Sequence, residues 1–348
     1  MRTILSLAAV VAAVLLTGAM ALTAGWVRPP IRSAQLGFRG LAMEQNVAPS
    51  EQARLKAANV VPEASEQAPA GGPLATTEYQ NVKVLTDLTT DQFNRVMLSI
   101  TEWVAPEQGC AYCHNVENLA DDGLYTKTVA RRMFQMTRAI NNDWKAHVAE
   151  TGVTCYTCHR GNPVPRYVWY NNPGPAHANG FAADRQGQNV ASKAAGMSSL
   201  PYTAIDNLLI GGSLRDTENI RVVSTTALPE GKGKTIKQTE QTYSLMMHMS
   251  EGLGVNCTFC HNSRAFSQWQ QSTPQRVTAW HGIQMVRDLN AQYLDPLKPT
   301  YPPNRLGVLG DAPKANCATC HQGLNKPLYG ASMIKDYPEL GAGHAPTP

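Results

Sequence analysis

The apolar pattern of the chain begins with a long uncharged segment at the N-terminus. Thr3 to Val27 are 25 consecutive residues without a charged side chain. About 20 apolar residues are enough for a helix to cross a hydrocarbon core of about 30 Å, so residues 1–28 are predicted to form a transmembrane anchor. Ala19-Met20-Ala21 also has the small-x-small pattern of a signal-peptidase site. We expect the helix to be retained and the rest of the chain to be exported, with a cleaved signal peptide as the alternative.

Two amphipathic segments predict the helices of the first half of the chain. The first starts at residues 89–92 (Thr-Thr-Asp-Gln), which have the spacing of a capping box. Its apolar side chains then recur at helical intervals: Phe93, Val96, Met97, Ile100 and Val104. The second segment, at about residues 126–148, carries a similar stripe: Val129, Met133, Met136, Ile140 and His147. Each segment predicts a helix with one face turned to the interior.

The second half of the chain repeats the first at an offset of 149 residues. The matched residues are Met97 with Met246, Gln135 and Met136 with Gln284 and Met285, Arg138 with Arg287, and Asn141 with Asn290. The repeat predicts two further helices, at about residues 239–251, ended by Gly252 and Gly254, and at about residues 274–293. A 13-residue insertion interrupts the match in the Pro-rich loop from Pro296 to Pro313. Because an internal repeat organises the whole chain, we predict two duplicated halves.

The remaining segments are predicted to be connections rather than packed domains. Residues 44–77 are rich in Pro, Ala, Glu and Gln, which is typical of an extended arm. Residues 163–204 are rich in Asn, Gly, Ala and Pro, which is typical of a surface excursion. No strand-rich block is present, so the predicted fold is mainly α with long irregular loops. The predicted boundaries are 1–28 for the anchor, 29–85 for a membrane-surface docking arm, 86–185 for the first repeat, 186–234 for the connecting segment, 235–335 for the second repeat and 336–348 for the C-terminal tail.

One pentapeptide pattern, Cys-x-x-Cys-His, occurs four times and uses all eight cysteines. The copies are Cys110-Ala111-Tyr112-Cys113-His114, Cys155-Tyr156-Thr157-Cys158-His159, Cys257-Thr258-Phe259-Cys260-His261 and Cys317-Ala318-Thr319-Cys320-His321. This is the c-type haem attachment signature, in which two thiols bond the porphyrin vinyl groups and the adjacent imidazole ligates the iron. Paired CxxC units also build structural zinc sites, but zinc gives no reason for a histidine after every second cysteine. The chain is therefore predicted to be a multihaem cytochrome c with two dihaem halves and four covalently bound haems c.

Composition and charge add two restrictions. The formal charge is +4, but four haems would bring ~8 propionate carboxylates and move the loaded protein to roughly −4. No dense run of Lys and Arg interleaved with aromatic residues is present, so nucleic-acid binding is not expected. Aromatic residues make up only 7% of the chain, and the apolar faces of the haems would supply part of the core that they normally form.

Each haem iron also needs a second axial ligand. Four of the nine histidines belong to the motifs. The others are His147, His177, His248, His281 and His344. Bis-histidine ligation throughout would need four of these five, so methionine is expected at several haems. The repeat places Met97 and Met246 at the same helical position, which favours them as ligands over core filling. Met247 and Met249 compete with Met246.

Met133 and His147 cannot reach the same iron from one helix. They are 14 positions apart, which is about 21 Å along a helix. Met133 would then serve the haem of His159, and His147 another haem. In the second half Gly282 stands where the first half has Met133, so the fourth haem lacks that methionine and His147 is a candidate from the opposite repeat. The rivals are His281, Met285 and Met136. If His147 does not bind iron, the alternative is a positively charged side chain that interacts with the dipole at the end of its helix.

The sequence from Gln35 to Leu340 resembles the tetrahaem cytochrome c subunit of purple-bacterial type photosynthetic reaction centres. The resemblance is carried by the four haem motifs and by residues 35–40, 79–88, 257–266 and 316–331. It implies the proximal iron ligands His114, His159, His261 and His321. It also implies Met97, Met133, Met246 and His147 as the sixth ligands, which settles the open fourth position.

The resemblance further implies how the protein works. The haems would form a linear stack on the periplasmic face of the L and M type reaction-centre subunits, within the light-harvesting core complex. A soluble donor, either a c-type cytochrome or a high-potential iron–sulfur protein, would reduce the distal end. The haem of the third motif would re-reduce the photo-oxidised bacteriochlorophyll of the special pair. The protein would thus be a single-pass electron-transfer subunit of the inner photosynthetic membrane with its haem domain in the periplasm, and not an independent enzyme.

Two features bear on this interpretation. Leu16-Thr17-Gly18-Ala19 resembles a lipobox whose cysteine is replaced by Ala19, so lipid attachment there is impossible and the apolar helix is the expected anchor.

The rival function is a membrane-anchored tetrahaem quinol dehydrogenase that feeds a periplasmic reductase. Such proteins usually have mostly bis-histidine haems, and Met97, Met133 and Met246 argue against that. A freestanding electron-storage cytochrome is a third interpretation and would lack a stable membrane partner.

Overall fold

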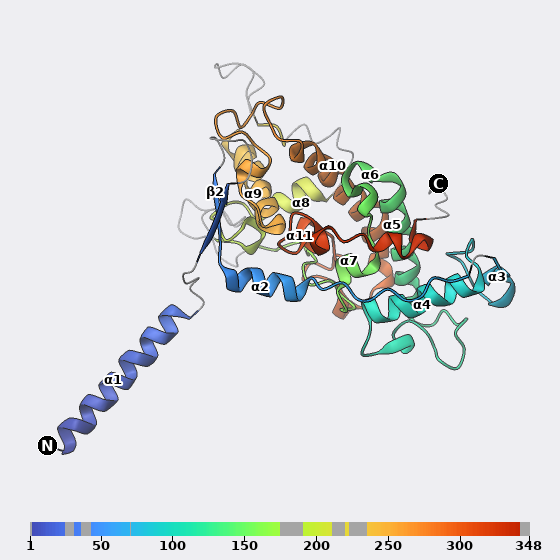
Figure 1. The fold of residues 1–348 in the computed structure, drawn as a ribbon, viewed down its shortest axis with the longest axis horizontal. Helices are drawn as coiled ribbons and strands as arrows, with labels where there is room; N and C mark the ends of the chain where they lie inside the picture. Colours follow the sequence, from blue (N-terminus) through green and yellow to red (C-terminus); the bar gives the residue numbers. More distant parts are fainter. Residues whose placement is uncertain are drawn as a thin grey trace. The chain divides into compact units, whose positions relative to one another are not determined.

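The computed structural model describes residues 2–24, 31–35, 43–69, 71–174, 191–210, 220–222 and 235–341 (Figure 1). The chain divides into two compact units, one formed by Met1–Gln35 and Glu44–Ala58 and the other by Leu36–Met43 and Asn59–Pro348. The larger unit contains all four Cys-x-x-Cys-His motifs. Two of the candidate ligands, His177 and His344, lie outside the described residues.

The smaller unit carries the predicted anchor. Helix α1, Arg2–Thr23, contains a candidate membrane span, Ile4–Thr23, with a mean hydropathy of 2.4 and none of it buried. At about 1.5 Å per residue, its 20 residues reach about 30 Å, the thickness of a hydrocarbon core. Strand β1, Arg32–Gln35, pairs antiparallel with β2, Glu44–Val47, and helix α2, Pro49–Ala58, follows. Residues 44–77 are therefore not extended throughout, because the Ala, Gln, Arg and Lys residues of α2 are strong helix formers.

The larger unit is built from helices and short helical turns. Its α-helices are α3 Ala75–Glu78, α4 Thr90–Val104, α5 Tyr125–Asp143, α6 Lys145–Val148, α7 Cys155–His159, α8 Ala204–Leu209, α9 Ile236–Leu253, α10 Gln275–Asp288 and α11 Cys317–His321. The turns are η1 Gly109–Tyr112, η2 Ala149–Thr151, η3 Lys193–Ala195, η5 Cys257–Phe259, η6 Leu289–Leu294, η7 Asp295–Thr300, η8 Pro303–Arg305, η9 Pro327–Gly330, η10 Met333–Lys335 and η11 Pro338–Leu340. In the described part of this unit, extended pairing is limited to isolated bridges. The prediction of a mainly helical fold is confirmed.

Helix α4 forms as its sequence predicts. The Thr89 side chain accepts from the Gln92 amide and the Gln92 side chain accepts from the Thr89 amide, which completes the capping box. The apolar stripe faces a cluster built around Trp103, which is 1% exposed. The helix ends at Val104, one residue before Ala105-Pro106, because the residue preceding a proline is disfavoured in helical conformation.

The second predicted helix of the first half is interrupted. Residues 126–148 were expected to be one helix, but α5 ends at Asp143, Trp144 leaves the helical conformation with ψ of 28°, and α6 follows. The reason is the Asn-Asn-Asp sequence at 141–143, since short polar side chains compete for backbone hydrogen bonds. Asn142, for example, donates to the Arg138 carbonyl. His147 lies on α6 as a consequence and is not on the stripe of α5.

The corresponding helices of the second half are α9 and α10. Helix α9 starts with a capping box between Thr235 and Gln238 and ends at Gly254, whose φ of 63° suits a left-handed cap. Gly252 lies inside α9, where a Cβ atom would be 3.2 Å from the Ala318 amide nitrogen of α11. Helix α10 continues into the π-helical turn η6. Both predicted helices are present.

Asn141 and Asn290, which the 149-residue offset matches, make the same hydrogen bonds. The Asn141 amide group donates to the Val153 carbonyl at 2.9 Å and accepts from the Val153 nitrogen at 2.7 Å. Asn290 does the same with Ala315, at 3.0 and 2.8 Å. Val153 and Ala315 each lie two residues before the first cysteine of a motif. Each asparagine therefore fixes the start of the second motif of its half.

Asn141 of α5 and Asn290 of η6 each also bond a segment that comes after the other half in the sequence. Asn141 also donates to the Leu340 carbonyl, and Asn290 to the Leu209 carbonyl. Leu340 lies at the C-terminal turn η11 and Leu209 ends α8, and both side chains are 0% exposed. The tail thus packs on α5 of the first half, while the segment between the halves packs on α10 of the second.

Candidate haem-binding sites

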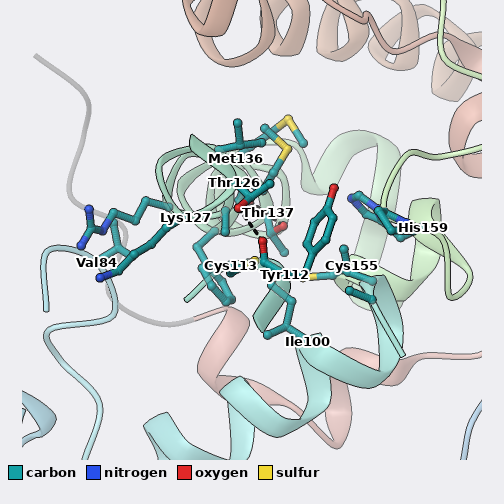
Figure 2. A pocket seen from close by; sticks show the side chains of 18 of the residues that line it. Val84, Ile100, Tyr112, Cys113, Thr126, Lys127, Met136, Thr137, Cys155 and His159 are labelled. Atoms are coloured by element: carbon teal, nitrogen blue, oxygen red, sulfur yellow. Dashed lines mark hydrogen bonds between the residues drawn. The ribbon is translucent and has the colours of Figure 1, made fainter. Parts of the chain in front are cut away.

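A cavity of about 600 Å³ is lined mainly by the first half of the larger unit, and residues of the second half, among them Arg305 and Cys320, also line it (Figure 2). Its lining includes Met97 and Ile100 of α4, Met133 and Met136 of α5, and Cys110, Cys113, His114, Cys155, Cys158 and His159 of the first two motifs. The volume falls within the range of about 300–1,000 Å³ that is usual for ligand cavities. Two of the predicted haem sites therefore share one apolar space.

The four motifs adopt two local structures. The second and fourth motifs are one-turn helices, α7 and α11, whose capping residues are Thr154 with Thr157 and Asn316 with Thr319. The first and third motifs are 3₁₀ turns in which the histidine amide bonds the carbonyl of the first cysteine at 3.0 Å. In both forms the two cysteines and the histidine lie on about one turn of chain.

The four motif histidines share one hydrogen-bond pattern. In each ring Nδ1 lies 2.8–3.0 Å from a backbone carbonyl oxygen: His114 to Leu119, His159 to Asn162, His261 to Phe266 and His321 to Leu324. A carbonyl oxygen only accepts, so Nδ1 carries the proton and Nε2 of the neutral ring keeps its lone pair. Such a bond is the usual orienting partner of a metal-ligating histidine.

Burial favours the uncharged form of three of the motif histidines and of two motif thiols. It lowers the pKa of His159 and His261, and it lowers the pKa of His321 to about 4. Burial also raises the pKa of the Cys155 and Cys317 thiols to about 12. At neutral pH His159, His261 and His321 are therefore neutral imidazoles, the form that binds iron, and the Cys155 and Cys317 thiols are protonated. The residues present fit a covalently attached haem at each motif.

His147 lies opposite the histidine of the fourth motif. The ring centres of His147 and His321 are 6.0 Å apart. Nδ1 of His147 donates to the Thr278 carbonyl at 2.9 Å, and burial lowers the pKa of the ring. His147 comes from the first half and His321 from the second. The structure therefore brings together two residues that the repeat linked only through the methionine that is missing at position 282.

The candidate methionines occupy different surroundings. Met97 and Met133 line the cavity with His114 and His159, and the rival Met136 lines it too. Met246 is partly buried against the apolar cluster around Leu245. Two other rivals, Met249 and Met285, are 8% and 6% exposed and lie within apolar clusters. Met249 and Met285 therefore fit core positions.

The second and fourth motifs contact each other directly. Sγ of Cys158 and Sγ of Cys320 are 2.7 Å apart. Each motif is followed by a residue in left-handed conformation, Arg160 and Gln322, and each of these reaches across to the other motif. Arg160 donates to the Cys320 carbonyl at 3.5 Å and Gln322 to the Cys158 carbonyl at 3.2 Å. Arg160 and Gln322 directly follow motif histidines in the sequence, but a contact between the two motifs was not predicted from that position.

The fourth motif also contacts α9, the helix that carries Met246. Ala318 of α11 packs on Gly252, and the Gly323 amide donates to the Gly252 carbonyl at 2.8 Å. The fourth motif thus lies between the second motif and α9, the helix that precedes the third motif in sequence. The 13-residue insertion closes the first cavity from the second half, because Arg305 donates to the hydroxyl of Tyr112 at 2.9 Å. Nothing in the sequence pattern indicated that contact.

Comparison with known proteins identifies the family. Residues 27–341 match the family model described as photosynthetic reaction centre cytochrome C subunit. The chain belongs to this family. It is 51% identical over 323 residues to the photosynthetic reaction center cytochrome c subunit of Rubrivivax gelatinosus, covering 92% of this chain and 87% of the relative. The subunit of Thermochromatium tepidum is 49% identical, covering 90% of this chain and 76% of the relative. The subunit of Roseobacter denitrificans is 45% identical, covering 90% of this chain and 86% of the relative.

Family membership establishes the general role. The protein is a haem-containing electron-transfer subunit of the photosynthetic reaction centre, and the quinol dehydrogenase alternative is not favoured. Membership in a cytochrome c family implies covalently bound haem c. A reaction-centre subunit is associated with the membrane, and α1 is a candidate anchor.

Proposed function

We propose that the chain binds four haems c, accepts electrons from a soluble periplasmic carrier and re-reduces the photo-oxidised special-pair bacteriochlorophyll. The observation that carries this proposal is the fourfold recurrence of two cysteines beside a histidine whose Nδ1 proton is held by a carbonyl. Bound haem supplies a reversible one-electron iron couple. The protein itself makes and breaks no substrate bond, so the work of its residues is to hold, orient and insulate the cofactors.

The proposed iron ligands are His114, His159, His261 and His321 on the proximal side and Met97, Met133, Met246 and His147 on the distal side. The separation of 6.0 Å between the rings of His147 and His321 supports the fourth pair. The location of Met97 and Met133 in the cavity of the first two motifs supports the first two pairs.

We also propose that the larger unit consists of two pseudo-repeated dihaem halves. Matched hydrogen bonds of Asn141 and Asn290 support this interpretation. A second matched pair joins the helix start to the preceding motif, because Thr126 donates to the Tyr112 carbonyl and Thr273 to the Phe259 carbonyl. The two asparagines are 149 residues apart and the two threonines 147 residues apart, so both pairs of hydrogen bonds recur at nearly the spacing of the sequence repeat.

The spatial arrangement of the motifs suggests the direction of electron transfer. The chain would accept electrons near the first motif and deliver them from the third, with the second and fourth motifs between. The contact between Cys158 and Cys320 supports the central step, and the packing of Ala318 on Gly252 supports the last. This order would place the third motif beside the L and M type subunits, within the light-harvesting core complex. The haem domain would then lie in the periplasm, anchored by a single span.

Flash spectroscopy on native membranes tests the proposal. The unaltered protein should be oxidised by one light flash and should co-purify with bacteriochlorophyll. A variant without the third pair of cysteines, Cys257→Ala with Cys260→Ala, should lose rapid oxidation. The matched variant at the first pair, Cys110→Ala with Cys113→Ala, should keep it and lose reduction by the soluble donor. A purified protein free of pigment, or one with fewer than four covalent haems, would contradict the proposal.

A further inference from the structure

Gly282 of α10 lies directly under the ring of His147. A Cβ atom on Gly282 would lie 2.5 Å from Cε1, 2.8 Å from Nδ1 and 3.1 Å from Nε2 of His147. Side-chain carbons do not approach ring atoms this closely, so any residue larger than glycine requires the ring to move. The repeat linked the two residues only through the methionine that is missing at position 282, and a direct contact between them was not predicted.

The backbone gives no other reason for a glycine at this position. Gly282 is buried inside α10 and has an ordinary helical conformation, which every L-residue can adopt. Glycine weakens a helix interior because it loses more conformational freedom than other residues on folding. The absence of a side chain is therefore explained by the space that His147 occupies.

The ring of His147 is fixed where it meets Gly282. Its Nδ1 donates to the carbonyl of Thr278, one helical turn before Gly282, at 2.9 Å. The ring centres of His147 and His321 are 6.0 Å apart. A new side chain at 282 would have to break the bond to Thr278 or push the ring out of the position opposite His321.

We propose that Gly282 selects histidine rather than methionine as the sixth ligand of the fourth haem. At the matched position the first half has Met133, whose side chain lines the haem cavity of its own half. Replacement of that methionine by glycine removes the local ligand and at the same time makes room for the imidazole from the other half. The inference rests on the proposed ligand set and adds the residue that determines it.

The test uses the full-length haem-loaded protein in membranes. Its readouts are the low-spin electron paramagnetic resonance signal of bis-histidine haem and a redox titration of the individual haems. Gly282→Ala should abolish or shift the bis-histidine signal of one haem and leave the midpoint potentials of the other three unchanged. Gly282→Met should raise the midpoint potential of the haem held by His321, because a thioether raises the potential relative to a second imidazole. Val277→Met adds a thioether at a position of α10 that is 43% exposed and should change nothing.

A double variant separates the steric effect from a general loss of folding. In the background of His147→Ala, a further Gly282→Ala change should not lower haem content or thermal stability any more, because the clash no longer exists. Gly282→Ala with an unchanged bis-histidine signal would overturn the inference and leave the ligand set intact. An equal loss of stability with and without His147 would also overturn it. A wild-type protein without any bis-histidine haem would overturn the ligand set and the inference together.

Discussion

The buried ion pair between Arg95 and Glu339 should hold the C-terminal turn on the first half. The two side chains are 5% and 4% exposed, and the guanidinium lies 3.1 Å from the carboxylate. Arg95 belongs to α4, two residues before Met97, and Glu339 belongs to η11. Replacing Glu339 by Gln keeps the shape and removes the charge, which leaves Arg95 buried without its carboxylate.

The expected cost follows from the remaining contacts of Arg95. Removing one partner of a buried pair typically costs about 3–5 kcal/mol. Arg95 would still donate to the carbonyls of Ser65, Glu66 and Asp336, and its guanidinium would still lie 4.0 Å from the centre of the Tyr337 ring. These contacts place the cost near the lower limit, at about 3 kcal/mol. Local opening of the turn should therefore become roughly 100-fold more frequent, since each ~1.4 kcal/mol is a factor of ten.

Hydrogen exchange of the haem-loaded protein, followed by mass spectrometry, measures this opening. The amide of Leu340 bonds the Tyr337 carbonyl, and the amide of Tyr337 bonds the Met333 carbonyl of the preceding turn η10. Both amides should exchange roughly 100-fold faster in Glu339→Gln. The matched control is Glu51→Gln, which breaks an exposed pair with Arg54 whose side chains are 44% and 60% exposed. Exposed pairs contribute about 0–1 kcal/mol, so exchange in α2 should rise less than about fivefold. An equally small effect in both variants would refute the argument.

Three further predictions concern the ligands and one surface carboxylate. Met97→His should lower the midpoint potential of a single haem in a redox titration, and four unchanged potentials would exclude Met97 as a ligand. His147→Met should raise the potential of the haem held by His321, whereas a shift confined to the haem of another motif would contradict ligation across the halves. Hydrogen bonds from Arg131 and Lys83 hold the pKa of Asp122 well below its ordinary 3.8. Because the folded-state pKa is the lower one, the stabilisation is present above pH ~4 and is lost as the pH falls below it. Exchange of residues 119–123 should therefore increase below pH ~4 in the wild type, and Asp122→Asn should remove this dependence.

Several features of the fold could be predicted because their causes are local. The capping box at Thr89 and the apolar stripe of α4 lie within 16 residues of sequence, and each positions atoms only a turn or two apart. The same holds for the Cys-x-x-Cys-His motifs, whose covalent chemistry needs only one turn of chain. The break between α5 and α6 was missed because three short polar residues outweighed an otherwise helical stripe.

The chain by itself determined which groups are available: four Cys-x-x-Cys-His motifs, a set of methionines at helical positions and one long apolar segment at the N-terminus. Only the tertiary structure decided which of them meet. His147 reaches Thr278 across 131 residues of sequence, and Cys158 reaches Cys320 across 162. Periodicity cannot encode such pairs, because their separation depends on how two halves pack together and not on the rise of one helix. Local patterns fix the chemistry of each motif, and long-range packing fixes which residues meet, as the rings of His147 and His321 do.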